Sequence, residues 1–154
     1  MATYINDNLG DGLTLPTYTN QPRLISAVVD FADTTSFPTG LADADVVRVL
    51  AIPQNSIITS AGVEVLTAGT GTGTIALADT LGSPNVFVAA AAPTSATQMT
   101  RASITNNLSI YPSGTQRYLT LTGATAGRTN GKVLVWALVT SLETRNETAA
   151  SFSV

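Results

Sequence analysis

Short segments rich in Val, Ile and Thr follow one another along most of this chain, and this succession limits the possible folds more than any other feature. The segments cover residues 24–31, 45–52, 57–67, 74–79, 86–91, 98–105, 108–111, 117–122 and 132–142. Gly, Pro, Asn and Ser stand between them, as is typical of turns, and no long amphipathic helix is evident. We therefore expect an all-β protein, an antiparallel β-sandwich of the jelly-roll type.

The segment at 132–142, KVLVWALVTSL, differs from a strand that has one face in water. Apolar side chains occupy both sets of alternate positions: Val133, Val135, Ala137 and Val139 in one set, and Leu134, Trp136 and Leu138 in the other. A half-solvated strand should alternate apolar with polar residues. We expect both faces to be covered, the second by a loop or the N-terminal segment of the same chain, or by another subunit that contacts Trp136.

Residues 1–22 are polar, carry several Gly and Pro residues and show no sustained period. We interpret them as an extended N-terminal arm, followed by a sandwich domain at 23–154. Such an arm is either a frayed terminus or a segment that orders on a neighbouring subunit. The second reading predicts an interface formed by apolar and aromatic residues of the arm and of the last strand: Tyr4, Ile5, Leu13, Leu15, Tyr18, Leu134, Trp136 and Leu138.

The composition argues against most chemistry. The chain has no Cys and no His, so it has neither a thiolate metal site nor the usual near-neutral general base. We expect no enzyme activity, no cofactor and no metal site. A net charge of −3 with seven scattered basic residues predicts no nucleic-acid surface. No apolar run is long enough for a membrane helix, and the N-terminus does not resemble a signal peptide.

A Gly- and Thr-rich stretch, Gly69-Thr70-Gly71-Thr72-Gly73, raises the question of phosphate binding. A phosphate loop needs a following helix N-terminus and usually a Lys. Here the strand-like residues 74–77 follow, and no Lys-Ser or Lys-Thr pair occurs. We interpret the stretch as a hairpin loop in which glycines supply positive φ angles.

Four acidic residues form two loose pairs, Asp30 with Asp33 and Asp43 with Asp45. Carboxylates at such spacing can join a Ca²⁺ site, but the D-x-D-x-D-G pattern of a calcium loop is absent. Asp side chains also accept hydrogen bonds from nearby backbone N–H groups in turns. We therefore expect these residues to form turns and to solvate strand edges.

Two stretches resemble a known class of protein. The first is ADVVRVLAIPQNSIITSAGVEVLTAGTGTGTIALAD, from Ala44, in which a strand ending in Ile-Pro leads through a turn and a Val-x-Val strand into a Gly/Thr-rich loop. The second is YLTLTGATAGRTNGKVLVWALVTSL, from Tyr118, which ends in a Gly-Lys-Val-x-Val-Trp strand. Both are similar to patterns in virion structural proteins of tailed bacteriophages. The arm at 1–22 is not part of that pattern.

The resemblance implies a capsid decoration, or cement, protein. Such a protein binds the outside of the major capsid protein shell, stabilises the head and often forms a homotrimer. It would be made in the host bacterial cytoplasm and end on the capsid surface of the virion. The absence of Cys agrees with assembly in a reducing compartment. Two alternatives remain open: a tail, neck or head-fibre component of a phage, and a carbohydrate-binding or adhesin-like sandwich.

Overall fold

The structure is a computed structural model, and it describes residues 3–5, 22–54, 56–80, 86–94, 99–101, 110–111 and 117–141. All regular structure in these ranges is β-strand, and no helix occurs among them. The strands are β1 (Thr3–Ile5), β2 (Arg23–Asp30), β3 (Val46–Ile52), β4 (Ser56–Thr67), β5 (Thr74–Asp79), β6 (Val86–Ala91), β7 (Met99–Arg101), β8 (Ile110–Tyr111), β9 (Arg117–Ala124) and β10 (Lys132–Ser141). The predicted all-β class is confirmed.

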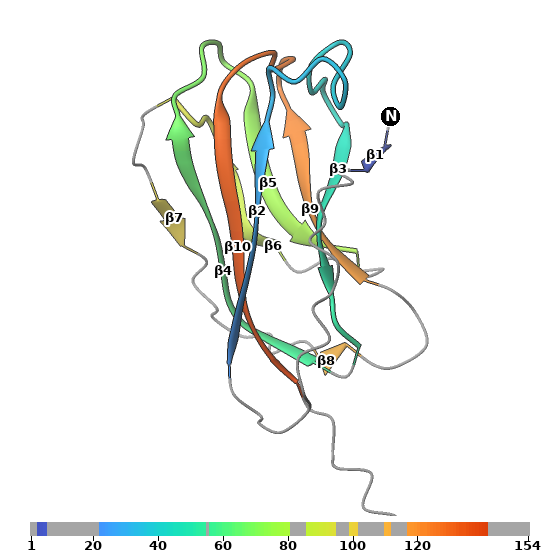
Figure 1. Ribbon diagram of the computed structural model, residues 1–154. Coiled ribbons are helices and arrows are strands. Elements are labelled where there is room, and N and C mark those ends of the chain that lie inside the picture. Colours follow the sequence, from blue (N-terminus) through green and yellow to red (C-terminus); the bar gives the residue numbers. More distant parts are fainter. Residues whose placement is uncertain are drawn as a thin grey trace, which may run out of the picture.

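Two sheets face each other and form a β-sandwich (Figure 1). The first sheet has the order β1-β3-β9-β5-β6, and the second has the order β2-β10-β4-β7, with β8 paired to β4. The pairings are antiparallel except for β1, which runs parallel to β3. Successive strands from β2 to β5 alternate between the sheets, and β10 lies between β2 and β4. The sandwich is therefore confirmed, and its jelly-roll type stays a prediction.

The core lies between the sheets and is formed by the inward side chains of both. In β10, Val133, Val135, Ala137 and Val139 are buried, as the alternation of that segment predicted. In the first sheet, Leu119 and Leu121 of the central strand β9 are fully buried. Burial of such side chains contributes about 1.5–3 kcal/mol each, so the facing valines and leucines are the main source of stability.

Strand β4 departs from simple alternation. Ile57 shares the odd positions of this segment with Ala61, Val63 and Val65, which are buried, but the buried isoleucine is Ile58 and not Ile57. The pairing of β4 with β10 shifts between Leu138 and Val139. A bulge of this kind moves all side chains beyond it to the opposite face, which explains why Ile58 is buried in place of Ile57.

The Gly69–Gly73 stretch connects two sheets and not two strands of a hairpin. It joins β4 in the second sheet to β5 in the first, so the predicted hairpin is wrong. Only Gly71 of this stretch has a positive φ, of 102°. A Cβ on Gly73 would lie 2.6 Å from the carbonyl oxygen of Ala126. Close backbone approach, and not backbone conformation alone, therefore requires glycine here.

Three connections meet at the upper end of the sandwich in Figure 1: β2–β3, β4–β5 and β9–β10. Two backbone hydrogen bonds join the β2–β3 and β9–β10 connections: Leu41 N–H donates to the Arg128 carbonyl oxygen, and Arg128 N–H donates to the Leu41 carbonyl oxygen, both at 2.8 Å. Asn130 joins the loops further: its Oδ1 accepts from Thr70 N at 2.7 Å, and its Nδ2 donates to Thr70 Oγ1 at 2.6 Å. This end of the molecule is therefore bonded across all three connections.

The first residues of the predicted arm belong to the first sheet, because Thr3–Ile5 pair with Val46–Arg48 of β3. This strand contains two of the predicted interface residues, Tyr4 and Ile5. Leu13, Leu15 and Tyr18 lie outside the described residues. The division into an arm at 1–22 and a domain at 23–154 stays a prediction.

Candidate functional site

The outward surface of the second sheet is apolar along its two adjacent strands β2 and β10. We call it the apolar face and define it by the outward side chains Leu24, Val28, Leu134, Trp136 and Leu138. In the pairing of the strands, Leu134 lies opposite Val28 and Leu138 lies opposite Leu24. Leu24 is 63% exposed and Val28 is 44% exposed, while the three β10 side chains are half-buried.

Trp136 lies at the middle of this face. Its cross-strand neighbours are Ser26 on β2 and Gly62 on β4. Because both neighbours are small, no large side chain opposes the indole across either strand pair. The apolar neighbours of the ring are Leu134 and Leu138 along β10 and the residues Leu24 and Val28 of β2, whereas the β4 side carries Ser60 and Glu64. An aromatic ring beside apolar side chains on an outward sheet face is typical of a protein interface.

The outward surface of the first sheet has a different character. Its two central strands, β9 and β5, present Thr120 and Thr122 beside Ala76 and Ala78. Further along, the guanidinium of Arg48 lies 5.0 Å from the centre of the Tyr118 ring. Thr120 is itself buried, at 4% exposed, and its Oγ1 donates to the Ala78 carbonyl oxygen at 3.1 Å, while Ala76, Ala78 and Thr122 are half-buried. Among the described residues, the outward side chains of β9 and β5 are small or hydroxyl-bearing, whereas β2 and β10 of the second sheet present large apolar side chains.

One end of the apolar face is closed by an ion pair. Lys132 Nζ lies 2.9 Å from Asp30 Oδ2, and the two residues are paired across β10 and β2. The hydrogen bond from Lys132, with a second from the Ala32 N–H at 3.0 Å, lowers the pKa of Asp30 below its usual value. A charged rim beside an apolar centre is the usual arrangement of a protein interface.

We expect Asp30→Asn to lower the free energy of unfolding by less than about 1 kcal/mol at neutral pH, because the pair is largely exposed. The pKa of Asp30 is lowered on folding, so its contribution is present above the unfolded value, about 3.9, and is lost as the pH falls through the folded value. Thermal melting between about pH 6 and pH 2 measures this. The difference between wild type and variant should shrink toward acid pH; a difference that stays constant with pH contradicts the assignment.

The sequence predicted Leu134, Trp136 and Leu138 as interface residues, and the structure places all three on one outward face. Leu24 and Val28 were missed. They lie at even positions of β2, which alternates only weakly in sequence, and only the pairing with β10 shows that they continue the same surface. The side chains of Tyr4 and Ile5 lie outside the described part of the structure, so their role in an interface stays a prediction.

Asp30, Asp33 and Asp45 accept hydrogen bonds within local turns, as predicted, whereas Asp43 bonds to the distant β9–β10 connection. Asp33 accepts from Thr35 N at 2.9 Å and from Ser36 Oγ at 2.8 Å, which lowers its pKa. Asp43 accepts from Thr125 N at 3.1 Å, and Asp45 from Ala42 N at 3.0 Å. Within the described ranges, no group of three or more acidic side chains is placed to hold a metal ion.

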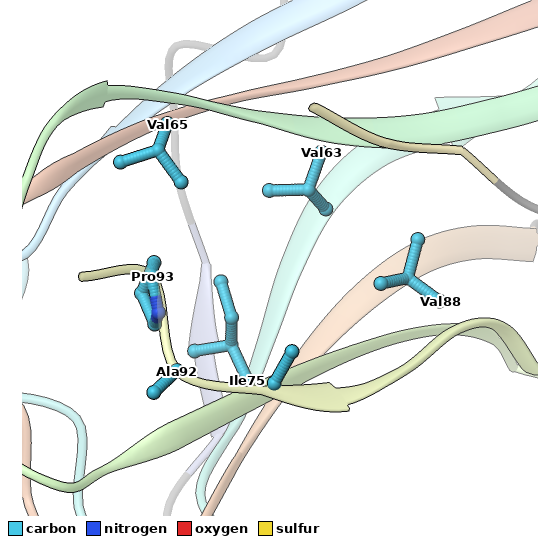
Figure 2. A pocket seen from close by; sticks show the side chains of 7 residues that line it. Val63, Val65, Ile75, Val88, Ala92 and Pro93 are labelled. Atoms are coloured by element: carbon cyan, nitrogen blue, oxygen red, sulfur yellow. The ribbon is translucent and has the colours of Figure 1, made fainter. Parts of the chain in front are cut away.

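A small apolar hollow opens between the sheets beside β6. Figure 2 shows the side chains of Val63, Val65, Ile75, Val88 and Pro93 turned toward it. Its volume of about 20 Å³ is close to that of one water-sized sphere, and its lining offers almost no polar atoms. The hollow is too small and too apolar to bind a substrate or a cofactor.

A comparison with solved structures finds a similar fold in a chain from the structure described as "Capsid of Ralstonia phage GP4". The TM-score is 0.63 over 93% of this chain and 100% of that chain, with 14% sequence identity. At this identity the likeness shows a shared fold. No known family profile matches the chain, and no curated protein sequence is significantly similar. No helix in the described residues could cross a membrane.

Proposed function

We propose that this protein is a capsid decoration, or cement, protein of a tailed bacteriophage, which binds the outside of the major capsid protein shell and stabilises the head. The observation that carries the proposal is the apolar face on a fold shared with a chain from a phage capsid. Exposed apolar surface of this kind usually marks a contact with another protein. The virion surface is the corresponding location.

The proposed role needs adhesion and no reactive group. A protein that binds the assembled shell but not its separated subunits stabilises the shell by RT ln(1 + [L]/Kd), about 2.7 kcal/mol at a concentration of 100 Kd. Repeated over many equivalent sites, a modest contact strengthens the whole head. A homotrimer would add avidity, because three linked contacts dissociate together only rarely. We include this trimer, and the absence of enzyme activity, in the proposal.

The experiment is co-sedimentation of the purified protein with assembled heads that lack it, followed by heating of the decorated and bare heads. The decorated heads should resist disruption at temperatures several degrees above those that break bare heads. Purified tails serve as the control particle. Binding to tails but not to heads would contradict the head assignment, and binding to neither would remove the proposal of a virion contact.

A further inference from the structure

Arg128, in the connection between β9 and β10, is a buried cation with most of its hydrogen-bonding capacity unused. The residue is 2% exposed. Its Nη2 donates to the Gly73 carbonyl oxygen at 2.6 Å, while Nε and Nη1 are buried and have no hydrogen-bond partner. Three of the five N–H groups of the guanidinium are on these two nitrogens. The group therefore keeps a full charge and at least three unpaired donors away from water.

The cover over this guanidinium is the Gly69–Gly73 loop. A Cβ at Gly69 would overlap with Nη1 of Arg128, so the absence of a side chain at residue 69 makes room for the guanidinium. Beyond it, Thr70, Gly71 and Thr72 are exposed. The loop is held by the exposed Thr70–Asn130 bonds at 2.7 and 2.6 Å and by a backbone bond from the Gly69 N–H to the Pro93 carbonyl oxygen at 3.1 Å.

An unpaired buried charge is costly, because the group has lost its water without gaining an opposite charge. Here burial lowers the pKa of Arg128. The carboxylate of Asp45, which is buried as well, accepts from the backbone N–H of Ala42. An apolar side chain could fill the same space without the cost of an unpaired charge. The buried arginine is therefore a candidate for recognition of an anion.

We propose that the guanidinium of Arg128, beneath the Gly69–Gly73 loop, is a binding site for a carboxylate. Arg pairs with carboxylate through two parallel N–H···O bonds, which are about twice as strong as neutral hydrogen bonds. Nε and Nη1 lie on different edges of the guanidinium, so such a pair would use one of them together with the N–H of Nη2 that does not bond to Gly73. The ligand reaches the site when the loop lifts, which opens the Thr70–Asn130 bonds and the bond from Gly69 N–H to the Pro93 carbonyl oxygen. The site is separate from the apolar face, so it does not depend on the proposed function.

The test compares the melting temperature of wild type and Arg128→Met as sodium acetate replaces sodium chloride at constant ionic strength. Acetate should raise the melting temperature of wild type by about 3 °C more than that of the variant at about 0.2 M. In chloride alone the variant should melt at the same temperature as wild type or higher, because it lacks the unpaired charge. Arg48→Met is the matched control: it removes an arginine that lies over Tyr118 and should keep the full acetate effect.

A second measurement keeps the proposal testable if Arg128→Met does not fold. In wild type, the ¹⁵N–¹H signal of Arg128 Nε should shift as acetate is added, and the shift should saturate. The signal is identified by its loss in Arg128→Lys. The melting temperature of Arg128→Lys should not depend on acetate. Equal acetate effects in wild type and variants, or a signal that does not move, would overturn the site and leave buried water as the partner of the guanidinium.

The carboxylate can come from a free solute or from an acidic side chain of a neighbouring protein. Once the acetate effect is established, co-sedimentation with assembled heads separates these sources. An Arg128→Met protein that binds heads as well as wild type assigns the site to a free carboxylate. If Arg128→Met loses head binding, and free acetate also weakens head binding of wild type, the carboxylate belongs to a side chain of the shell. Failure of wild type to bind heads would contradict the proposed function and leave the acetate result unaffected.

Discussion

Trp136→Asp should leave the sandwich folded and weaken its binding to assembled heads by about 100-fold or more, equivalent to about 2.7 kcal/mol. The ring lies at the centre of the apolar face, between Leu134 and Leu138 on the same strand. Central aromatic residues supply most of the binding energy of many interfaces, and an Asp would place an unpaired carboxylate in a surface that becomes dry on binding. Co-sedimentation with heads measures the affinity, and circular dichroism with thermal melting verifies the fold.

Thr122→Asp is the matched control for this substitution. Thr122 is half-buried on the outward surface of the first sheet, on its central strand β9. The same charge placed there should leave the affinity unchanged if the apolar face is the contact surface. An unchanged affinity in Trp136→Asp, or an equal loss in both variants, would show that the second sheet does not make the contact.

Leu121→Ala should lower the free energy of unfolding by about 3 kcal/mol and the melting temperature by about 9 °C. Leu121 is 0% exposed and lies on β9, where Val47 of β3 and Leu77 of β5 are its cross-strand partners. The truncation leaves a cavity between the two sheets. Because β9 is paired with a strand on each side, the surrounding side chains can move little to fill that cavity. Urea unfolding measures the free energy, and thermal melting gives the second value.

Leu24→Ala is the control, because it removes the same atoms from a side chain that is 63% exposed. It should change the free energy of unfolding by less than about 0.5 kcal/mol. Head binding should show the reverse pattern. Leu24→Ala should weaken it, because Leu24 belongs to the apolar face, and Leu121→Ala should not, because Leu121 lies in the core. Similar losses of stability in both would contradict the division between core and outward face.

The strands could be predicted from the sequence because a period of two is a local property. The segments expected at 74–79 and 86–91 agree with β5 and β6, and the one at 132–142 with β10 to within a residue. Their connections are not local in this sense. Gly69–Gly73 has the composition of a hairpin loop, but whether the next strand pairs with the last or crosses to the other sheet depends on packing between distant residues.

The candidate site could also be predicted only in part, because the alternation of side chains along a strand is local and the arrangement of the loops is not. The double apolar pattern of residues 132–142 indicated that Trp136 lies on a surface that needs a cover, and the structure places it on an outward face. Arg128 was missed altogether. In sequence it is an ordinary arginine in a turn, and only the arrangement of the loops shows that its side chain is buried against Gly73 and Gly69.

The order of strands has a consequence for how the chain reaches its native state. Of the strand pairs described, only β5–β6 joins neighbours along the chain, so the sheets cannot close hairpin by hairpin. Strand β10 lies between β2 and β4, so the second sheet stays incomplete until residues 132–141 have been synthesised. Non-local pairing of this kind slows folding and leaves strand edges open meanwhile. A nascent chain is therefore most at risk of aggregation just before β10 emerges from the ribosome.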